Sequence, residues 1–486
     1  MSQAAQIGGG IAAPAGSPRP AITTAADVDR LFAGLAVPAA AGRRAGGRRA
    51  RALFRRLGDP QEQFRSVHVA GTAGKGSVVA LLAAVLRAHG HLVGAHLSPH
   101  VFSVLERFQI DGGPVRPEQL DGVVDPVAEA AVHPDQQRIG GAGYAELTMA
   151  TAFELFAQRA VDYGLVEAGI GGRHDATNAI ARPDKLAVLT SVGLDHTDVL
   201  GTSLAEIAAD KADIVAPDGI AVASGGRAPE VDDVVAATAA RRRCRLVWST
   251  PDRSVELAHR TADGCWRGLY RGAAGRTWLA PPVPGRHQLD NALLAVQVAE
   301  QLAARDGWRL DAETTSAAIA EVRLPGRFDR RSWHGCEVVL DGAHNPDKLS
   351  ALAEAVRGRY GSRHGGVWVL AMAADKDVDA GVAALAGQAA ALVATETVPA
   401  AHGPSGARAV PASAIAGAAM AHGVPLVETV PDPRQALTRA CALATPGCPV
   451  VVTGSFRLLG QVAPEPGDAG TRPSPRPVAA AAATRR

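Results

Sequence analysis

The residues with the clearest chemical potential lie in a glycine-rich loop, within the segment VHVAGTAGKGS at 67–77. The usual phosphate loop reads G-x-x-x-x-G-K-[ST]; here two residues, not four, separate Gly71 from Gly74, and Gly76 stands between Lys75 and Ser77. Such glycines let backbone N–H groups approach phosphate oxygens at the positive end of a helix. The lysine can bridge the outer phosphates, and the hydroxyl can reach Mg²⁺ or a phosphate. The pattern favours binding of ATP or GTP over the alternative, a glycine turn before a buried helix with a solvated lysine.

Polar side chains also follow two apolar segments that read as strands. Glu167 ends YGLVE and is followed by glycines, Arg173 and Asp175, while Asp195 and His196 follow LAVLTSV. In open α/β sheets, ligands bind at the carboxyl ends of the strands. A carboxylate and an imidazole there, beside a phosphate loop, suit a hard cation next to a triphosphate. For His196 alone the alternative is a structural histidine, but the polar ends of the neighbouring strands favour the metal site.

The elements that must position these residues are short apolar strands alternating with longer Ala- and Leu-rich helices. This alternation is typical of a mainly parallel sheet covered by helices. The first helix after the loop is predicted over 78–88, and the alternation restarts after residue 323 with CEVVLDGAH, a helix over 348–360, GVWVLAM and PVVVTGSF. The sequence therefore predicts an α/β fold, with a P-loop-type, mainly parallel domain at 23–322 and a smaller Rossmann-like α/β domain at 323–462. A hairpin is predicted over 254–271.

Composition limits the class of protein. The chain has 486 residues, 47% of them hydrophobic, and a formal net charge of +2, which favours neither nucleic acid nor an anionic membrane as a partner. Its five cysteines form no C-x-x-C pair, which indicates a reducing compartment without a disulfide framework or thiolate zinc site. No signal peptide or long apolar run is present, so we expect a cytoplasmic protein. The Pro-, Ala-, Gly- and Arg-rich ends, 1–22 and 463–486, are predicted to be disordered tails.

From about residue 53 to 461 the chain resembles the folylpolyglutamate synthase/dihydrofolate synthase branch of the Mur ligases, which are ATP-dependent amino-acid ligases. Its HVAGTAGKGS is similar to the phosphate loop of this family, whose spacing departs from other phosphate loops in the way just described. The other motifs that carry the resemblance follow in family order: LSPHVFSVLERFQIDG, VEAGIGGRHDATN, GLDHTDVLGTSLAEIAADKADI, GRHQLDNALLA, LPGRFDR, LDGAHNP, DKD at 375–377 and GSFRLLGQV.

The resemblance implies roles for individual residues. ATP would be held by Gly74, Lys75, Gly76, Ser77, Asn291, Arg327 and Asp341, the last at the ribose. One or two magnesium ions would be bound by Ser98, Glu167 and His196. The residues implied in catalysis are Lys75, Lys211 and His344, the histidine near the incoming amino acid. The carboxylate substrate would contact Tyr144, Glu146 and Asp175, the aspartate near a pterin.

The reaction implied by the resemblance joins L-glutamate to dihydropteroate or to folylpolyglutamate. ATP would phosphorylate the substrate carboxylate to an acyl phosphate, the amine of glutamate would attack it, and ADP and phosphate would leave. Magnesium and Lys75 would offset the charge on the phosphoryl oxygens, and closure of two domains, in a monomer, would bring the reactants together.

Three positions depart from the family pattern. Ala73 replaces the usual asparagine of the loop, Ala145 stands where relatives have phenylalanine, and Met149 where they have threonine. Loss of an aromatic wall would weaken a pterin pocket, unless Tyr144 fills the space. Two alternatives therefore remain at this stage: a ligase of the same mechanism acting on another carboxylate, from peptidoglycan or secondary metabolism, and a nucleotide-binding protein without catalysis.

Lys211 is predicted to be buried and carbamylated. A capping box of Ser203 and Glu206 predicts a helix that runs to about residue 216. The neighbours of Lys211 at helical spacing are apolar: Ile207, Ala208, Ile214 and Val215. Burial would lower the pKa of the lysine and leave a neutral amine able to add CO₂, giving a carbamate, as the family carries at this position. The alternative is a lysine whose ammonium reaches water along the apolar face.

Overall fold

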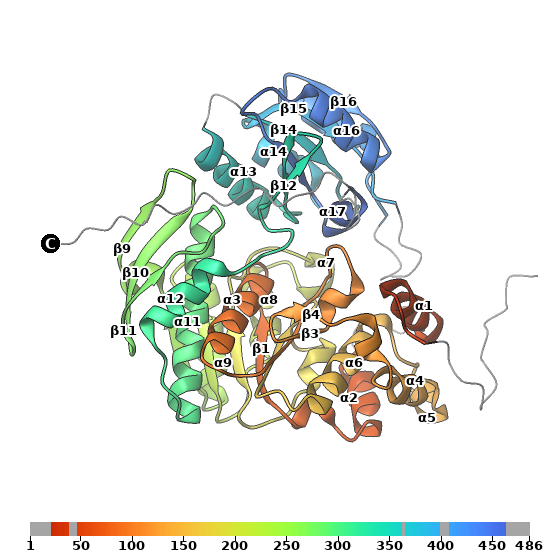
Figure 1. The fold of residues 1–486 in the computed structure, drawn as a ribbon, viewed down its shortest axis with the longest axis vertical. Helices are drawn as coiled ribbons and strands as arrows, with labels where there is room; N and C mark the ends of the chain where they lie inside the picture. The colour runs from red at the N-terminus through yellow and green to blue at the C-terminus, as the bar shows by residue number, and fades with distance from the viewer. Residues whose placement is uncertain (1–20, 38–45, 362–364, 399–407, 463–486) are drawn as a thin grey trace, which may run out of the picture.

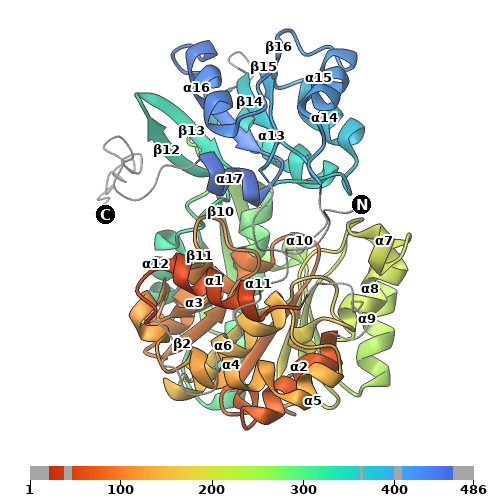
Figure 2. The ribbon, with the colours of Figure 1, turned by 90° about the vertical axis from the view of Figure 1, so that its right-hand side faces the viewer.

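The computed structural model describes residues 21–37, 46–361, 365–398 and 408–462. Of the two predicted tails, only residues 21 and 22 lie within these ranges, and Ile22 is already part of the core, with 1% of its surface exposed. Figure 1 shows two domains, the second, from β12 onward, lying above the first. Figure 2 shows the same arrangement at a right angle, with α17 at the lower edge of the second domain.

The first domain is built on an eight-stranded sheet in the order β4-β3-β2-β5-β1-β6-β7-β8. The strands β2-β5-β1-β6-β7-β8 pair in parallel. Strand β3 pairs antiparallel with both β2 and β4. The strands are β1 Arg65–Ala70, β2 Val93–His96, β3 Gln109–Ile110, β4 Gly113–Pro114, β5 Tyr163–Glu167, β6 Leu186–Leu189, β7 Ile220–Ser224 and β8 Arg245–Ser249.

Helices cover both faces of this sheet, which is why its strands read as continuous apolar runs. On β1, Val67 and Val69 face the core shared with α3, α11 and α12, while Ala70 faces the core shared with α8 and α9. The helices of the domain are α1 Ala25–Leu35, α2 Gly46–Arg56, α3 Lys75–Ala88, α4 Val124–Val132, α5 Pro134–Arg138, α6 Tyr144–Gln158, α7 Thr197–Leu200, α8 Leu204–Ala212, α9 Pro229–Arg241, α10 Pro251–Ser254, α11 Arg286–Asp306 and α12 Ala312–Glu321. Four 3₁₀ helices join them: η3 Pro60–Glu62, η4 Val104–Arg107, η5 Pro117–Leu120 and η6 Ala176–Ala179.

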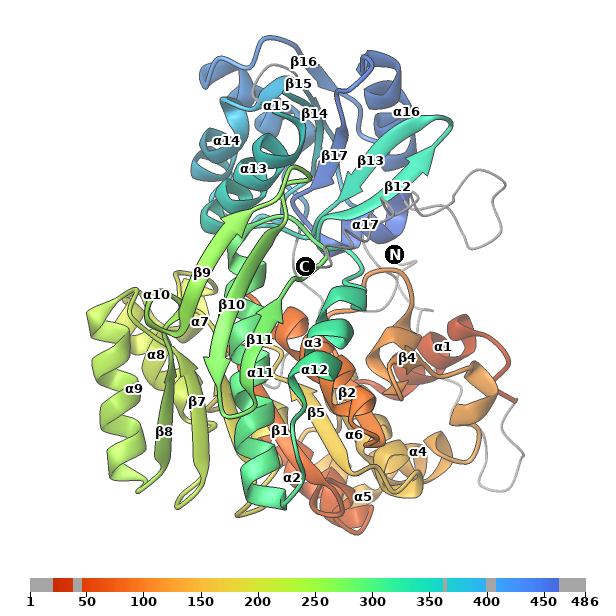
Figure 3. The ribbon, with the colours of Figure 1, turned by 60° about the vertical axis from the view of Figure 1, so that its left-hand side comes forward.

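The predicted hairpin is present and is part of a three-stranded antiparallel sheet. It consists of β9 Val255–Arg260, β10 Trp266–Gly272 and a third strand, β11 Gly275–Leu279, in the order β11-β10-β9. Figure 3 shows the β9–β10 hairpin rising along the side of the first domain toward α13 of the second.

The second domain has a six-stranded sheet in the order β12-β13-β17-β14-β15-β16, parallel except for the β12–β13 pair. Its strands are β12 Asp329–Trp333, β13 Cys336–Leu340, β14 Gly366–Leu370, β15 Ala389–Ala394, β16 Val427–Thr429 and β17 Val450–Thr453. Helices α13 Pro346–Tyr360, α14 Val378–Ala386 and α15 Ala412–Ala421 cover one face; α16 Pro433–Leu443 and α17 Phe456–Val462 cover the other. The predicted α/β fold is confirmed.

The boundaries of three helices differ from the prediction. Helix α13 begins at Pro346, two residues before its predicted start. Helix α3 begins at Lys75, not at residue 78, so Lys75, Gly76 and Ser77 form its first turn. The capping box of Ser203 and Glu206 is present, but α8 ends at Ala212, four residues before the predicted end.

An apolar contact joins the domains beside the functional site. Val101, in the loop after β2, is 6% exposed and belongs to the core of the second domain, with Leu458 and Leu459 of α17. The guanidinium of Arg331 on β12 lies 4.3 Å from the centre of the Phe102 ring. The first domain therefore inserts part of its own loop into the second.

Candidate functional site

The phosphate loop follows β1 and leads into α3, as the sequence predicts. Gly74 is the N-cap of α3 with a φ of 88°, a left-handed conformation that favours glycine. The Nζ of Lys75 donates to the carbonyl oxygen of Gly71 at 3.1 Å, so the lysine curls back over the loop. Ser77 is buried in the first turn of the helix. The N–H groups of this first turn lack partners within the helix and are suited to an anion.

The glycines of the loop also make room for other residues of the predicted site. A Cβ at Gly74 would collide with the side chain of Asn291, from α11. A Cβ at Gly76 would collide with the guanidinium of Arg327, which comes from the segment between the domains. Asn291 and Arg327, both predicted to contact ATP, therefore lie directly against the phosphate loop.

Ser98 and Glu167 lie together at the carboxyl ends of β2 and β5. The amide of Ser98 donates to the Glu167 carboxylate at 3.1 Å. Glu167 is 4% exposed, and burial raises its pKa, although the positive charges of Lys75 and Arg327 oppose this shift. A buried carboxylate whose negative charge is only partly compensated by neighbouring positive charges is suited to binding a cation.

Arg107 connects this pair to the predicted substrate site, a role that the sequence did not reveal. Its Nη1 donates to Ser98 Oγ at 3.3 Å, its Nε donates to Nδ1 of His100 at 3.0 Å, and its guanidinium lies 5.6 Å from the centre of the Tyr144 ring. Arg107 lies in LSPHVFSVLERFQIDG, one of the motifs that carry the family resemblance, but the sequence predicts no role for it.

Two of the three residues predicted to bind the carboxylate substrate, Tyr144 and Asp175, lie near Ser98. Asp175 caps η6 and accepts the amides of Ile170 and Thr177, both at 3.0 Å. A Cβ at Gly169 would be 3.2 Å from the Asp175 carboxylate and 3.9 Å from Ser98 Oγ. Tyr144, at the start of α6, donates its hydroxyl to Asp29 of α1 at 2.7 Å.

Glu146, the third of these residues, is turned into the core. Its Oε1 pairs with Arg49 of α2 at 2.7 Å, and its Oε2 accepts the amide of Gly143. Met149, one of the departures from the family pattern, is likewise buried, in the core shared by α1, α2 and α6, whereas Ala145 is exposed.

Lys211 is buried, as its apolar neighbours predict. It is 4% exposed, and its Nζ donates to the carbonyl oxygen of Gly71 at 3.0 Å. Burial, together with the positive charge of Lys75, lowers the pKa of Lys211 to about 7. The alternative of an ammonium reaching water is therefore not the conformation observed.

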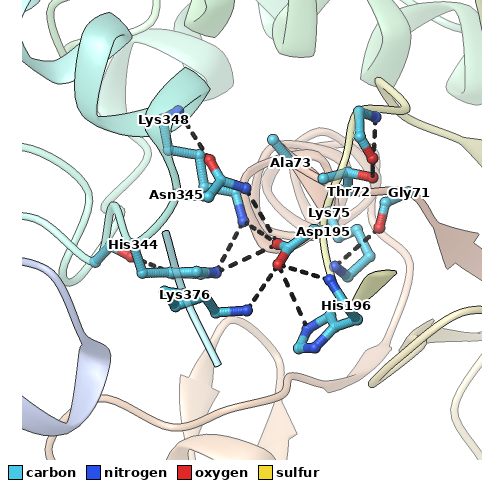
Figure 4. A network of polar contacts seen from close by, with 12 residues as sticks. Gly71, Thr72, Ala73, Lys75, Asp195, His196, His344, Asn345, Lys348 and Lys376 are labelled. Atoms are coloured by element: carbon cyan, nitrogen blue, oxygen red, sulfur yellow. Dashed lines mark hydrogen bonds and ion pairs between the residues drawn. The ribbon is translucent and has the colours of Figure 1, made fainter. Parts of the chain in front are cut away.

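Asp195 connects the two domains in a network of polar contacts shown in Figure 4. Its carboxylate accepts hydrogen bonds from Asn345 Nδ2 at 3.2 Å, Lys348 Nζ at 3.1 Å and Lys376 Nζ at 2.8 Å, all from the second domain. Burial opposes its ionisation, but contacts with His344, Lys348 and Lys376 outweigh burial and hold the pKa of Asp195 well below its usual range.

His344 lies in this network as a neutral imidazole. Burial and the charge of Lys348 lower the pKa of His344. The geometry fits a proton on Nδ1, which is 2.7 Å from the carbonyl oxygen of Gly342, while Nε2 accepts from Lys348 Nζ at 3.0 Å. The sequence does not predict Lys348 and Lys376 as site residues, although Lys348 lies just after the motif LDGAHNP and Lys376 lies within DKD.

Asp341, predicted to contact ribose, follows β13 at the carboxyl end of the second sheet. It accepts the amides of Phe328 and Ala343, both at 2.8 Å. Burial raises the pKa of Asp341 to about 6, and the charge of Arg327 opposes this shift.

Within the described ranges, no three His, Cys, Asp or Glu side chains are placed to hold a metal ion together. Of the predicted metal ligands, Ser98 and Glu167 adjoin, whereas the Nε2 of His196 lies 3.9 Å from Asp195. None of the helices described has the length and apolarity needed to cross a membrane.

Comparisons with known proteins agree with this arrangement. A family model described as the Mur ligase, glutamate ligase domain matches residues 326–456. The dihydrofolate synthase/folylpolyglutamate synthase of Mycobacterium tuberculosis is 37% identical over 349 residues, which cover 69% of this chain and 70% of the relative. The folylpolyglutamate synthase of Lacticaseibacillus casei is 34% identical over 422 residues, covering 85% of this chain and 93% of the relative.

The fold is also that of a solved enzyme. The structure of Mycobacterium tuberculosis folylpolyglutamate synthase complexed with ADP matches with a TM-score of 0.78 and 31% identity, covering 90% of this chain and 96% of that one. This match spans both domains of the chain. The chain belongs to the folylpolyglutamate synthase/dihydrofolate synthase family of ATP-dependent ligases.

Proposed function

We propose that this protein joins L-glutamate to dihydropteroate or to a folate through an acyl phosphate, using ATP and releasing ADP and phosphate. The observation that carries the proposal is the meeting of Arg327, His344 and Lys348 of the domain predicted at 323–462 with the phosphate loop and Asp195 of the domain predicted at 23–322. Transfer of a phosphoryl group to a carboxylate needs cations and positioning more than covalent chemistry from the protein.

In the predicted monomer, the nucleotide would lie between the domains. Gly74, Gly76 and Ser77 would bind phosphate through the first turn of α3, and Lys75 would turn from Gly71 to the outer phosphates. Asn291 and Arg327 already lie against this loop. Asp341 would accept hydrogen bonds from the ribose.

The donor groups fit Mg²⁺, which uses one or two protein carboxylates together with phosphate oxygens and water. Ser98 Oγ and the buried Glu167 carboxylate would hold it, with His196 nearby. Mg²⁺ would neutralise charge on the phosphoryl oxygens of ATP. A carbamate on Lys211, formed by its neutral amine and CO₂, would add a second anionic group near Lys75.

Bond formation would then proceed in two steps. An oxygen of the substrate carboxylate attacks the γ-phosphorus, and the bond to ADP breaks. The amine of glutamate attacks the acyl carbon, the C–O bond to phosphate breaks, and the proton that the amine loses leaves with the phosphate. The unprotonated Nε2 of His344, released from Lys348, would orient this amine and accept its hydrogen bond.

The folate side of the substrate would lie between Asp175 and Tyr144. The ring of Tyr144 packs edge-on against Phe32 at 6.1 Å and lies under Arg107, so Tyr144 would supply an aromatic side chain beside Ala145. Met149 lies in the core. This arrangement supports a pterin ligand over the alternative of an unrelated carboxylate.

The test is product analysis with a panel of substrates. Dihydropteroate or a reduced folate, each with L-glutamate, ATP and Mg²⁺, should give ADP and phosphate in equal amounts. AMP and pyrophosphate would instead indicate adenylation and refute the acyl phosphate. If another carboxylate is ligated while neither pterin substrate is, the departures at Ala145 and Met149 change specificity and the folate assignment is wrong.

A further inference from the structure

The β9–β10 hairpin of the first domain contacts the second domain far along α13 from the phosphate loop. A Cβ placed at Gly264, in the hairpin turn, would be 3.0 Å from Cα and 3.1 Å from N of Arg359. Close by, a Cβ at Gly358 would be 3.0 Å from Nη1 of Arg260, at the end of β9. The turn therefore touches the backbone of α13 itself.

The turn is rigid and carries a charge that faces α13. The amides of Thr261 and Gly264 close it with bonds to the carbonyl oxygens of Cys265 and Thr261, at 2.8 and 3.0 Å. Asp263 is fixed by the hydroxyl of Thr261 and faces the positive charge of Arg359. Beyond β11, Val283 packs against the cores of both domains. Backbone contact, opposite charges and an apolar side chain thus meet at one interface.

The other end of α13 is part of the functional site. Asn345 caps this helix, and Asn345 and Lys348 both bind Asp195. A helix of 15 residues is roughly 22 Å long and moves as a rigid body. The first domain therefore holds α13 near both ends, and a tilt at Arg359 would displace Lys348 and His344.

We propose that the β9–β10 hairpin is a positioning element: its turn at Asp263 and Gly264 fixes the angle of α13 and thereby places Lys348 and His344 over the phosphate loop. This inference rests on the proposed function, in which Lys348 and His344 meet Asp195 and the phosphate loop of the first domain. Figure 3 shows the hairpin beside α13.

The chain contains a matched pair of glycines for testing the proposal. Gly264 and Gly275 both lie in the three-stranded sheet with positive φ, 82° and 96°. A Cβ at Gly275 would have nothing within 4 Å, whereas one at Gly264 meets the backbone of Arg359. Alanine at either position imposes the same kind of backbone strain, but only Gly264→Ala should push on α13.

The measurement compares steady-state kinetics with nucleotide affinity in the full-length protein. Gly264→Ala should lower kcat by about tenfold or more and raise KM for glutamate, because a displacement of about 1 Å at reacting groups can cost on the order of a hundredfold. Its Kd for ADP should change less than threefold, on the order of ordinary surface changes, since the phosphate loop is untouched. Gly275→Ala should match the unaltered protein. Equal kinetics in both glycine variants would overturn the proposal.

A second comparison covers the case in which Gly264→Ala does not fold. Arg359→Ala removes the charge that faces Asp263, and Arg357→Ala removes an exposed arginine from the same last turn of α13. Only the first should lower kcat, and equal kcat values would count against the hairpin. Lys348→Ala separates the two ideas: if it lowers kcat while the hairpin variants do not, the hairpin inference alone fails. If Lys348→Ala is fully active, the proposed function of Lys348 fails.

Discussion

Lysine side chains surround the phosphate loop and affect one another. After burial, the positive charge of Lys75 is a further cause that lowers the pKa of Lys211 to about 7 and of Lys348 to about 8. Asp195 offsets part of this charge through Lys348 and Lys376. A polyanion such as the triphosphate of ATP would relieve the repulsion among the lysines, so the site is electrostatically prepared for nucleotide.

Lys211→Ala tests the proposed carbamate. Activity should fall by on the order of a hundredfold, because an anionic group beside the phosphates is lost, while nucleotide still binds. Acetate or formate should restore part of the activity by occupying the vacated space. Near-normal activity of the variant would refute the proposal.

The pH dependence of CO₂ addition follows from the lowered pKa of Lys211. Its amine is mostly neutral above pH 7 and mostly protonated below, since its pKa is about 7. After removal of CO₂, bicarbonate should therefore restore activity faster at pH 8 than at pH 6. Recovery that is faster at pH 6, or independent of pH, would contradict the prediction.

At the scale of elements, α2 and α6 are joined by a buried ion pair. The side chains of Arg49 and Glu146 are 9% and 5% exposed, and Arg49 Nη2 is 2.7 Å from Glu146 Oε1. Glu146 is also the third residue of α6 and accepts the amide of Gly143 before the helix. The pair therefore fixes the start of α6, where Tyr144 projects toward Arg107.

Arg49→Met should destabilise the first domain by about 3 kcal/mol or more, because it leaves a buried carboxylate without its partner. Arg49→Met combined with Glu146→Gln should lose less, since no buried charge remains. Urea unfolding of the unaltered protein, Arg49→Met, Glu146→Gln and the double variant measures this double-mutant cycle. A double variant less stable than Arg49→Met alone would contradict the expectation.

Local sequence patterns predict many of the helices and strands, whereas contacts between distant parts of the chain determine the remaining features. The capping box at Ser203 and the apolar neighbours Ile207 and Ala208 of Lys211 lie within one helix, where spacing fixes which side chains adjoin. The hydrogen-bond donors to Asp195 could not be predicted in this way, because Lys348 and Lys376 lie 153 and 181 residues away in the sequence. The third strand, β11, was missed because its Gly275–Leu279 segment is short and its partner is the hairpin already predicted.

At the scale of the whole molecule, Val101 is an apolar link between the domains. Removing its buried side chain should cost roughly 2 kcal/mol of interdomain stabilisation. Val101→Ala should therefore separate the calorimetric unfolding of the two domains and lower kcat. Val104→Ala is the control, because Val104 is 1% exposed within the core of the first domain. If both variants unfold in one shared transition, Val101 does not couple the domains.

The packing of α3 against α11 has a consequence for biosynthesis. Helix α3 follows the phosphate loop, yet one of its faces packs on α11, about two hundred residues later in the chain. Until the ribosome has released residue 306, the apolar side chains of α3, such as Leu82 and Val85, have no partner helix to cover them. Strand β1, in the middle of the sheet, likewise has no neighbouring strand until β5 and β6 have been translated. The nascent first domain therefore exposes its nucleotide-binding helix for most of its translation, the period in which a chaperone that recognises apolar segments would bind it.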